Sequence, residues 1–206
     1  MLSAARRKGI VELVVTVAVA VFFVITVQAY AVKPYRVPSG SMEPTLRVGQ
    51  RLIVDRFSHR FLSAKPKVGQ IVVFHPPHGA DPAEPICGAQ GEGDGTRTPC
   101  DQPTAQRSSQ TFVKRVVGVG GDRIAIRGGH VVRNGKLQSE PFAARCQPGG
   151  GCDFPHAVTV PKGYVYLMGD NRGDSDDSRY WGPVPIDWVI GNAVVTYWPP
   201  GRLGTL

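Results

Sequence analysis

One long apolar segment near the N-terminus constrains this chain more than any other feature. Residues 10–32 are apolar except for four polar side chains, which lie mostly toward the two ends of the segment. As a helix with a rise of 1.5 Å per residue, it would be about 34 Å long, enough to cross the hydrocarbon core of a bilayer. We therefore predict one transmembrane helix at 10–32, followed by a single domain of ordinary size at 33–206.

The charges that flank this segment predict its direction. Three basic residues at 6–8 precede it, whereas Lys33 and Arg36 follow it. Because positive charge favours the cytoplasmic side, we expect residues 1–9 to be cytoplasmic and 33–206 to be extracytoplasmic. The chain would then be a single-pass protein of the cell membrane, with the lipid bilayer as a partner.

A cleavable secretory signal is the alternative interpretation of the same segment. Basic residues, an apolar run and then Ala29-Tyr30-Ala31 match its pattern, but the run is longer than a usual signal core, which favours an uncleaved anchor. A cut after Ala31 would leave Val32 as the new N-terminus. Since Ser41 lies only ten residues beyond Ala31, we would expect such a cut in trans. Both interpretations place the remaining chain outside the cytoplasm.

The four cysteines fall into two local pairs, Cys87 with Cys100 and Cys146 with Cys152, and each pair brackets a glycine-rich loop. In an oxidising compartment these pairs predict two loop-closing disulfides, although four cysteines allow three connectivities. Zinc is disfavoured, because neither pair has CxxC spacing and no histidine lies within two residues of a cysteine. We expect no metal and no cofactor.

Beyond residue 33 the sequence predicts a mainly β, antiparallel domain. The 25 glycines and 18 prolines imply many turns and short strands, and Asn134-Gly135 is a strong hairpin signal. No stretch shows sustained helical periodicity. The expected strands are Arg51–Asp55, Gln70–Phe74, Thr111–Val119, Arg123–Arg127, His130–Arg133, Tyr164–Met168 and Val189–Trp198.

Two polar segments interrupt these strands. Residues 75–110 are rich in glycine and proline with little to bury, which predicts a long surface insertion pinned by one cysteine pair. Residues 143–156 form a second polar loop, closed by the other pair. The net charge of +8 is not concentrated in a basic run beyond the first residues. It therefore suits a domain near anionic lipid, and we expect no nucleic-acid partner.

The first stretch whose residues could take part in catalysis is PSGSMEPTL at 38–46, just after the apolar segment. Its prolines stiffen the loop, and we expect Gly40, between Ser39 and Ser41, to permit a tight bend. A serine hydroxyl is a weak nucleophile until a base removes its proton. The stretch therefore indicates a nucleophile only if the chain supplies a base elsewhere.

The best candidate base is Lys114. The five histidines lie in polar or turn-rich surroundings that predict surface positions, and an SxxK arrangement fails because Pro44 is the third residue after Ser41. Strand alternation places Lys114 on one face with Phe112 and Val116. Burial among apolar side chains lowers the pKa of a lysine, so that the neutral amine can accept a proton.

A third dense stretch, GDNRGDSDDSRYWG at 169–182, follows a predicted strand. A charged surface turn and a calcium site are two interpretations of it. The spacing of its acids does not match an EF-hand, and Arg172 and Arg179 would oppose a cation. An internally paired loop fits better.

Together, and in this order, PSGSMEPTL, FVKRVVGVGGD (112–122) and GDNRGDSDDSRYWG resemble the bacterial type I signal peptidases, membrane-bound Ser–Lys proteases of family S26. The resemblance implies an antiparallel β-sheet protease domain. It also implies a serine endopeptidase that removes N-terminal signal peptides from secretory preproteins. Such an enzyme cuts after small residues, in an A-x-A-like pattern, through an acyl-enzyme. The chain departs from the family's best-known members, which have two membrane helices, because it has one membrane segment and an insertion at 75–110. The insertion leaves the motifs intact.

The same resemblance implies residue roles. Ser41 matches the nucleophile and Lys114 the general base. Ser39 matches an oxyanion-hole hydroxyl, and Ser175 the serine that orients the lysine. The remaining matches are a structural ion pair of Asp177 with Arg179, substrate-pocket positions at Val37 and Val113, and supporting positions at Asp170, Asn171, Arg172 and Ser178.

Two rival classes remain. A self-cleaving repressor would also use serine and lysine in a β domain, but it would lack the membrane segment and need a DNA-binding domain. A non-enzymatic anchored binding domain would use the motif residues structurally. The RFSHRFL stretch (56–62) and the tryptophans Trp181, Trp188 and Trp198 could rest on lipid, with core packing as the alternative for the tryptophans.

Overall fold

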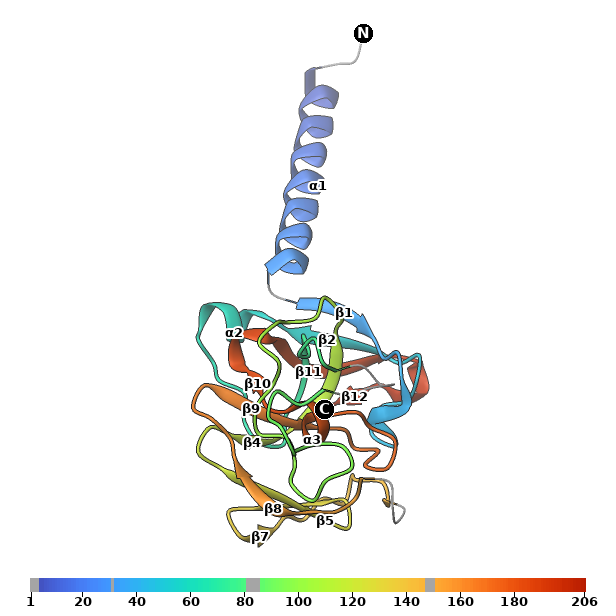
Figure 1. Ribbon diagram of the computed structural model, residues 1–206. Helices are drawn as coiled ribbons and strands as arrows, with labels where there is room; N and C mark the ends of the chain where they lie inside the picture. The colour runs from blue at the N-terminus through green and yellow to red at the C-terminus, as the bar shows by residue number, and fades with distance from the viewer. Residues whose placement is uncertain (1–3, 31, 81–85, 147–150) are drawn as a thin grey trace.

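A single helix stands away from a β domain in the computed structural model, which describes residues 4–30, 32–80, 86–146 and 151–206 (Figure 1). The helix α1 (Ala4–Tyr30) begins six residues before the predicted segment and ends two residues before its end. Within it, Arg7–Ile25 has a mean hydropathy of 2.4 and is not buried against the domain. Its length and composition suffice to cross a membrane.

Two antiparallel sheets make up the domain, which confirms the predicted mainly β fold. The larger sheet has the order β1 (Val32–Arg36), β2 (Arg51–Asp55), β11 (Val189–Trp198), β3 (Ile71–Phe74), β4 (Phe112–Val119), β9 (Tyr164–Met168) and β10 (Val184–Pro185), and β12 (Gly204–Thr205) pairs with β11. The smaller sheet has the order β7 (Lys136–Leu137), β6 (His130–Arg133), β5 (Arg123–Arg127) and β8 (Phe154–Thr159). The short helices are η1 (Gly40–Met42), α2 (Phe57–Phe61), α3 (Ser178–Trp181), η2 (Ile186–Trp188) and η3 (Pro200–Arg202).

Every strand expected from the sequence is present, with boundaries within one residue. The sequence did not predict β1, β7, β8, β10 and β12. Proline interrupts β1, β8 and β10, and the other two are only two residues long, so that pairing with a neighbour and not local propensity defines these strands. The strand β8 also begins inside the segment expected to be a polar loop.

The central strand β4 touches all three apolar clusters of the domain. Val113 belongs to the cluster beneath the 38–46 turn, Val116 to the cluster that surrounds Trp181, and Val117 to the cluster between the two sheets. Five of the eight β4 residues are buried, namely three valines together with Gly118 and Lys114. This strand gives Lys114 a rigid and dry position.

The insertion at 75–110 is more buried than its composition predicts. Cys100 is fully buried, its backbone N–H donates to the Arg179 carbonyl oxygen at 2.9 Å, and its own carbonyl oxygen accepts from the Tyr166 hydroxyl at 3.5 Å. The expectation of a surface loop with little to bury was therefore wrong for this part. Backbone hydrogen bonds and a disulfide hold this polar segment against α3, and Ala80 adds an apolar contact in the cluster around Trp181.

Both disulfides are the local pairs expected from the sequence, Cys87–Cys100 and Cys146–Cys152. Some predicted features fall outside the described residues. These are Ala31 of the possible cleavage site, residues 81–85 of the insertion and residues 147–150 of the second loop.

Candidate active site

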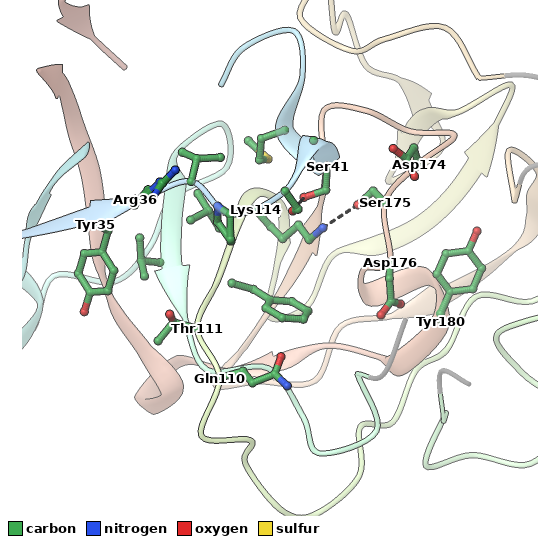
Figure 2. A pocket seen from close by; sticks show the side chains of 18 of the residues that line it. Tyr35, Arg36, Ser41, Gln110, Thr111, Lys114, Asp174, Ser175, Asp176 and Tyr180 are labelled. Atoms are coloured by element: carbon green, nitrogen blue, oxygen red, sulfur yellow. Dashed lines mark hydrogen bonds between the residues drawn. The ribbon is translucent and has the colours of Figure 1, made fainter. Parts of the chain in front are cut away.

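A cleft of about 880 Å³ lies where the 38–46 turn, β4 and the 169–182 loop meet. Ser41 and Lys114 both line it, and Figure 2 shows the two side chains close together, with Ser175 beyond the lysine. None of the five histidines, all of which lie in the described part of the chain, lines the cleft. The expectation that lysine and not histidine accompanies the serine agrees with this arrangement.

The turn that carries Ser41 is the short helix η1. Its hydroxyl oxygen lies 3.3 Å from the hydroxyl oxygen of Ser39, and the buried side chain of Met42 fixes the turn from below. Gly40 lies in this tight turn, but the bend does not depend on a glycine. The φ of Gly40 is not in the left-handed region, and a Cβ there would meet its first neighbour only at 3.8 Å.

Lys114 is only 3% exposed. Its Nζ donates a hydrogen bond to the Ser175 hydroxyl at 2.9 Å. Burial lowers the pKa of Lys114 to about 8, because its charged form loses hydration, and this effect outweighs the nearby carboxylates of Asp177 and Asp176. A substantial fraction of the amine is therefore neutral near physiological pH.

A buried ion pair holds Ser175 in place. The Ser175 hydroxyl donates to Asp177 Oδ2 at 2.8 Å, and Arg179 donates to both Asp177 oxygens at 2.8 and 2.9 Å. Burial alone would raise the pKa of Asp177, but the charge and hydrogen bonds of Arg179 lower it overall. Since the serine gives its one proton to a carboxylate, its oxygen is left to accept from Lys114.

Arg179 is also held by both cysteine loops. Its Nη1 donates to the Gly151 carbonyl oxygen at 2.7 Å, and its own carbonyl oxygen accepts from Cys100. The ion pair therefore sits between the insertion and the second disulfide loop. These contacts explain why the two polar segments lie against the site.

The 169–182 loop docks directly on the Ser41 turn. The backbone N–H of Asn171 donates to the Ser41 carbonyl oxygen at 3.0 Å, and its side-chain amide donates to the Gly40 carbonyl oxygen at 3.2 Å. Gly169 lies so close to the Ser41 turn that an added Cβ would overlap both Ser175 Oγ and the Ser41 carbonyl oxygen. Sequence reasoning missed this role of Gly169, for which its place at the start of the dense stretch was the only signal.

Other residues of this loop bind the two sheets. Asp170 accepts two hydrogen bonds from Arg115 at 2.8 and 2.7 Å, a partner that the sequence analysis did not single out. Arg172 pairs with Glu140 at 2.7 Å and also donates to the Gly129 carbonyl oxygen. Ser178 Oγ accepts from the backbone of Leu167. All four positions expected to be supporting therefore have structural contacts.

Val37 and Val113 line the cleft and are nearly buried, at 2% and 7% exposure. They belong to one apolar cluster with Met42. The cleft thus has an apolar wall beside Ser41, which suits a small apolar side chain. The tryptophans differ from one another, because Trp181 is fully buried whereas Trp198 is half exposed.

The chain matches the family described as signal peptidase, peptidase S26, over residues 10–198. It is 34% identical to a probable signal peptidase I-2 of Synechocystis sp., over 95% of this chain and 76% of that protein. It is 32% identical to a signal peptidase I of Mycobacterium tuberculosis, over 98% of this chain and 77% of that protein. A crystal structure of a signal peptidase I from Enterococcus faecalis covers 63% of this chain and 97% of its own, at 24% identity and a TM-score of 0.42.

Gly169→Ala should destabilise the domain, because the added methyl group would overlap the Ser41 backbone and the Ser175 side chain. We expect the free energy of unfolding to fall by about 2 kcal/mol, as for other overpacked sites. Chemical denaturation of the detergent-solubilised chain measures this change. Gly201→Ala, where a Cβ meets nothing within 4 Å, is the matched control and should leave stability nearly unchanged. Equal stability of the two variants would contradict the close approach.

Proposed function

Because the chain belongs to the signal peptidase family, peptidase S26, we propose that it removes signal peptides from secretory preproteins by a Ser–Lys mechanism in the Ser41 cleft. One observation carries this proposal. Lys114 is buried, is hydrogen-bonded to the neutral hydroxyl of Ser175, and lines the same cleft as Ser41. A lysine in this state can act as a general base without the help of a metal or cofactor.

In the proposed reaction, Lys114 accepts the proton of the Ser41 hydroxyl while the serine oxygen attacks the scissile carbonyl. The Ser39 hydroxyl and the backbone N–H of Ser41 donate to the oxygen that becomes negatively charged, and each such donor can contribute about 3 kcal/mol. Lys114 then gives its proton to the leaving amine. Water hydrolyses the acyl-enzyme, again with Lys114 as the base.

The apolar wall supports a preference for small residues before the cut. Val37 and Val113 are buried in one close-packed apolar cluster with Met42, so they cannot retract to admit a large side chain. A shallow apolar pocket of this kind accepts alanine and excludes bulky residues. We propose that the enzyme cuts after A-x-A-like sequences.

We further propose that α1 anchors the protein in the cell membrane, with residues 1–9 in the cytoplasm and the catalytic domain on the other side. The apolar length of α1 and the basic residues before it support this arrangement. Two disulfides also suit an oxidising, extracytoplasmic compartment.

The lipid surface would also contact α2, which lies at the end of the domain nearest α1 (Figure 1). Phe57 and Phe61 on α2 are 44% and 51% exposed, and the guanidinium of Arg60 lies 5.9 Å from the Phe61 ring centre. Exposed aromatic rings beside basic residues suit the interface of an anionic membrane.

Ser41→Ala and Lys114→Ala should each reduce cleavage of a secretory preprotein by about a thousandfold or more, because each removes a group that acts only with the other. Ser109→Ala and Lys162→Ala, at exposed positions outside the cleft, are the matched controls and should cut like the parent. Gel analysis of the processed and unprocessed preprotein measures the rates. Normal cleavage by both site variants would rule out the Ser–Lys mechanism.

The pH dependence follows from the burial of Lys114. Only the neutral amine accepts the Ser41 proton, and the pKa of Lys114 is lowered to about 8. We therefore expect kcat/KM to rise about tenfold per pH unit below pH 8 and to level off above it. If kcat/KM instead kept rising up to about pH 10.5, the ordinary pKa of lysine, burial would not lower the pKa of this residue.

The lipid contact predicts a local difference in amide hydrogen exchange. In nanodiscs, amides at 57–62 should exchange more slowly with anionic than with zwitterionic lipids, because basic residues accompany the exposed rings. The hairpin turn at 133–136, at the end of the domain away from α1, is the internal control (Figure 1). Equal exchange at 57–62 in both lipids would argue against this contact.

A further inference from the structure

A second hollow, of about 410 Å³, lies beside α2 at the end of the domain nearest α1 (Figure 1). Five of its nine lining residues are basic, namely Arg56, His59, Arg60, His75 and Arg107. We propose that this basic hollow binds the phosphate group of an anionic membrane lipid. The inference rests on the lipid contact proposed for α2, and it goes further because it names the bound group and the residues that bind it.

Three segments that are far apart in the sequence build the basic hollow. Residues 56–60 form one side of it. The insertion contributes His75 from its start and Arg107 from near its end, where a β-bridge between Pro77 and Arg107 holds the two ends together. The backbone N–H of His75 donates to the Trp188 carbonyl oxygen at 2.9 Å, which fixes the third segment. The fold, and not a basic run in the sequence, therefore gathers these charges.

The arginines of the basic hollow differ from those around the catalytic site. Arg172 and Arg179 are buried and each pairs with a carboxylate. Arg60 and Arg107 are exposed, and neither forms an ion pair within the described ranges, although Asp187 also lines the hollow. Like charges that gather without a counter-charge repel one another, and a bound anion would offset this repulsion. Because both side chains are exposed, a ligand can reach them.

His59 can add a further charge. Its ring nitrogens lie 2.8 and 3.2 Å from the carbonyl oxygens of Ala64 and Ile186. A carbonyl oxygen only accepts, so both contacts are hydrogen bonds only when the ring is protonated. A bound anion would stabilise that charged ring by direct attraction. The same two contacts hold α2 against η2, so they also fix the wall of the basic hollow.

The surroundings of the basic hollow favour a lipid over a soluble phosphate. Phe57 and Phe61 are exposed on α2, and Trp188 is a half-buried part of the lining. Aromatic rings of this kind suit the headgroup layer of a membrane, where one side of the ring meets acyl chains. A soluble phosphate would not use these rings. The guanidinium groups would donate hydrogen bonds to the lipid phosphate oxygens at the same level.

The test measures lipid binding to the full chain in neutral detergent micelles by native mass spectrometry. The probes are dioleoyl phosphatidylglycerol, which is anionic, and dioleoyl phosphatidylcholine, whose phosphate is neutralised by its own ammonium group. We expect the parent to bind phosphatidylglycerol on the order of tenfold more tightly than phosphatidylcholine, because a net negative headgroup is attracted to the arginines. The double variant Arg60→Gln/Arg107→Gln should lose most of this preference, since it loses charged hydrogen bonds to phosphate.

Two further variants control the test. Arg127→Gln removes an exposed arginine from β5, at the end of the domain away from α1, and should keep the parent's preference (Figure 1). Asp187→Asn removes the acidic residue of the basic hollow and should tighten phosphatidylglycerol binding by roughly threefold, as for other exposed charge pairs. A gain of affinity distinguishes a binding site from arginines that only support the fold. It also keeps the proposal testable if the double variant folds poorly.

Ammonium phosphate separates the two sources of the bound group. Added at the same concentration as the lipid, it should not displace phosphatidylglycerol. Displacement would identify a soluble-phosphate site and overturn the lipid proposal. Equal affinity of the parent for both lipids, or unchanged phosphatidylglycerol affinity in both the double variant and Asp187→Asn, would overturn it as well.

These outcomes are independent of the proposed function. Lipid binding is measured without a preprotein, so cleavage in the Ser41 cleft can succeed or fail separately. Slower amide exchange at 57–62 in anionic nanodiscs, together with unchanged lipid affinity in the variants, would support the α2 contact and overturn the basic hollow alone.

Discussion

The buried pair of Asp177 and Arg179 holds the whole site together. Taking two charges out of water is costly, and such a pair is tolerated only when hydrogen bonds satisfy its remaining atoms. Here Asp177 accepts from Ser175 and from the backbone of Gly169, while Arg179 donates to Gly151 and accepts from Cys100. The pair therefore links the lysine, the Ser41 turn and both disulfide loops in one network.

Ser175 lies between the amine of Lys114 and the carboxylate of Asp177 in this network. A carboxylate bonded directly to Lys114 would raise the pKa of the lysine and keep it charged. Instead, Asp177 fixes the Ser175 hydroxyl by a hydrogen bond, and that hydroxyl accepts a hydrogen bond from Lys114. The lysine is thus oriented without a direct ion pair. Burial can then lower the pKa of Lys114 to about 8, although carboxylates lie nearby. Orientation and activation of the lysine thus come from different groups.

The polar segments show how a chain can be ordered without an apolar core of its own. The insertion at 75–110 is closed by Cys87–Cys100 and bonded through its backbone to α3. Such contacts satisfy the buried peptide groups that would otherwise keep the segment in water. This arrangement brings Asp94 to the cleft, where composition alone suggested only a surface loop.

Features set by local patterns could be predicted from the sequence. The length of the apolar run specified α1, alternation specified the long strands, and Asn134-Gly135 adopts the positive φ angles that its hairpin requires. The close spacing of the cysteines specified the local pairs. The order of the three motifs identified Ser41, Lys114 and Ser175 as one site.

The tertiary structure decided which distant groups meet. The contact of Gly169 with the Ser41 turn and the pairing of Arg115 with Asp170 depend on groups that approach one another across the fold. Local sequence encodes backbone angles and periodicity, whereas these contacts arise only when sheets and loops pack. The sequence by itself therefore determined the elements and the residues that we propose to react. Packing determined their partners, their ionisation and the lining of the cleft.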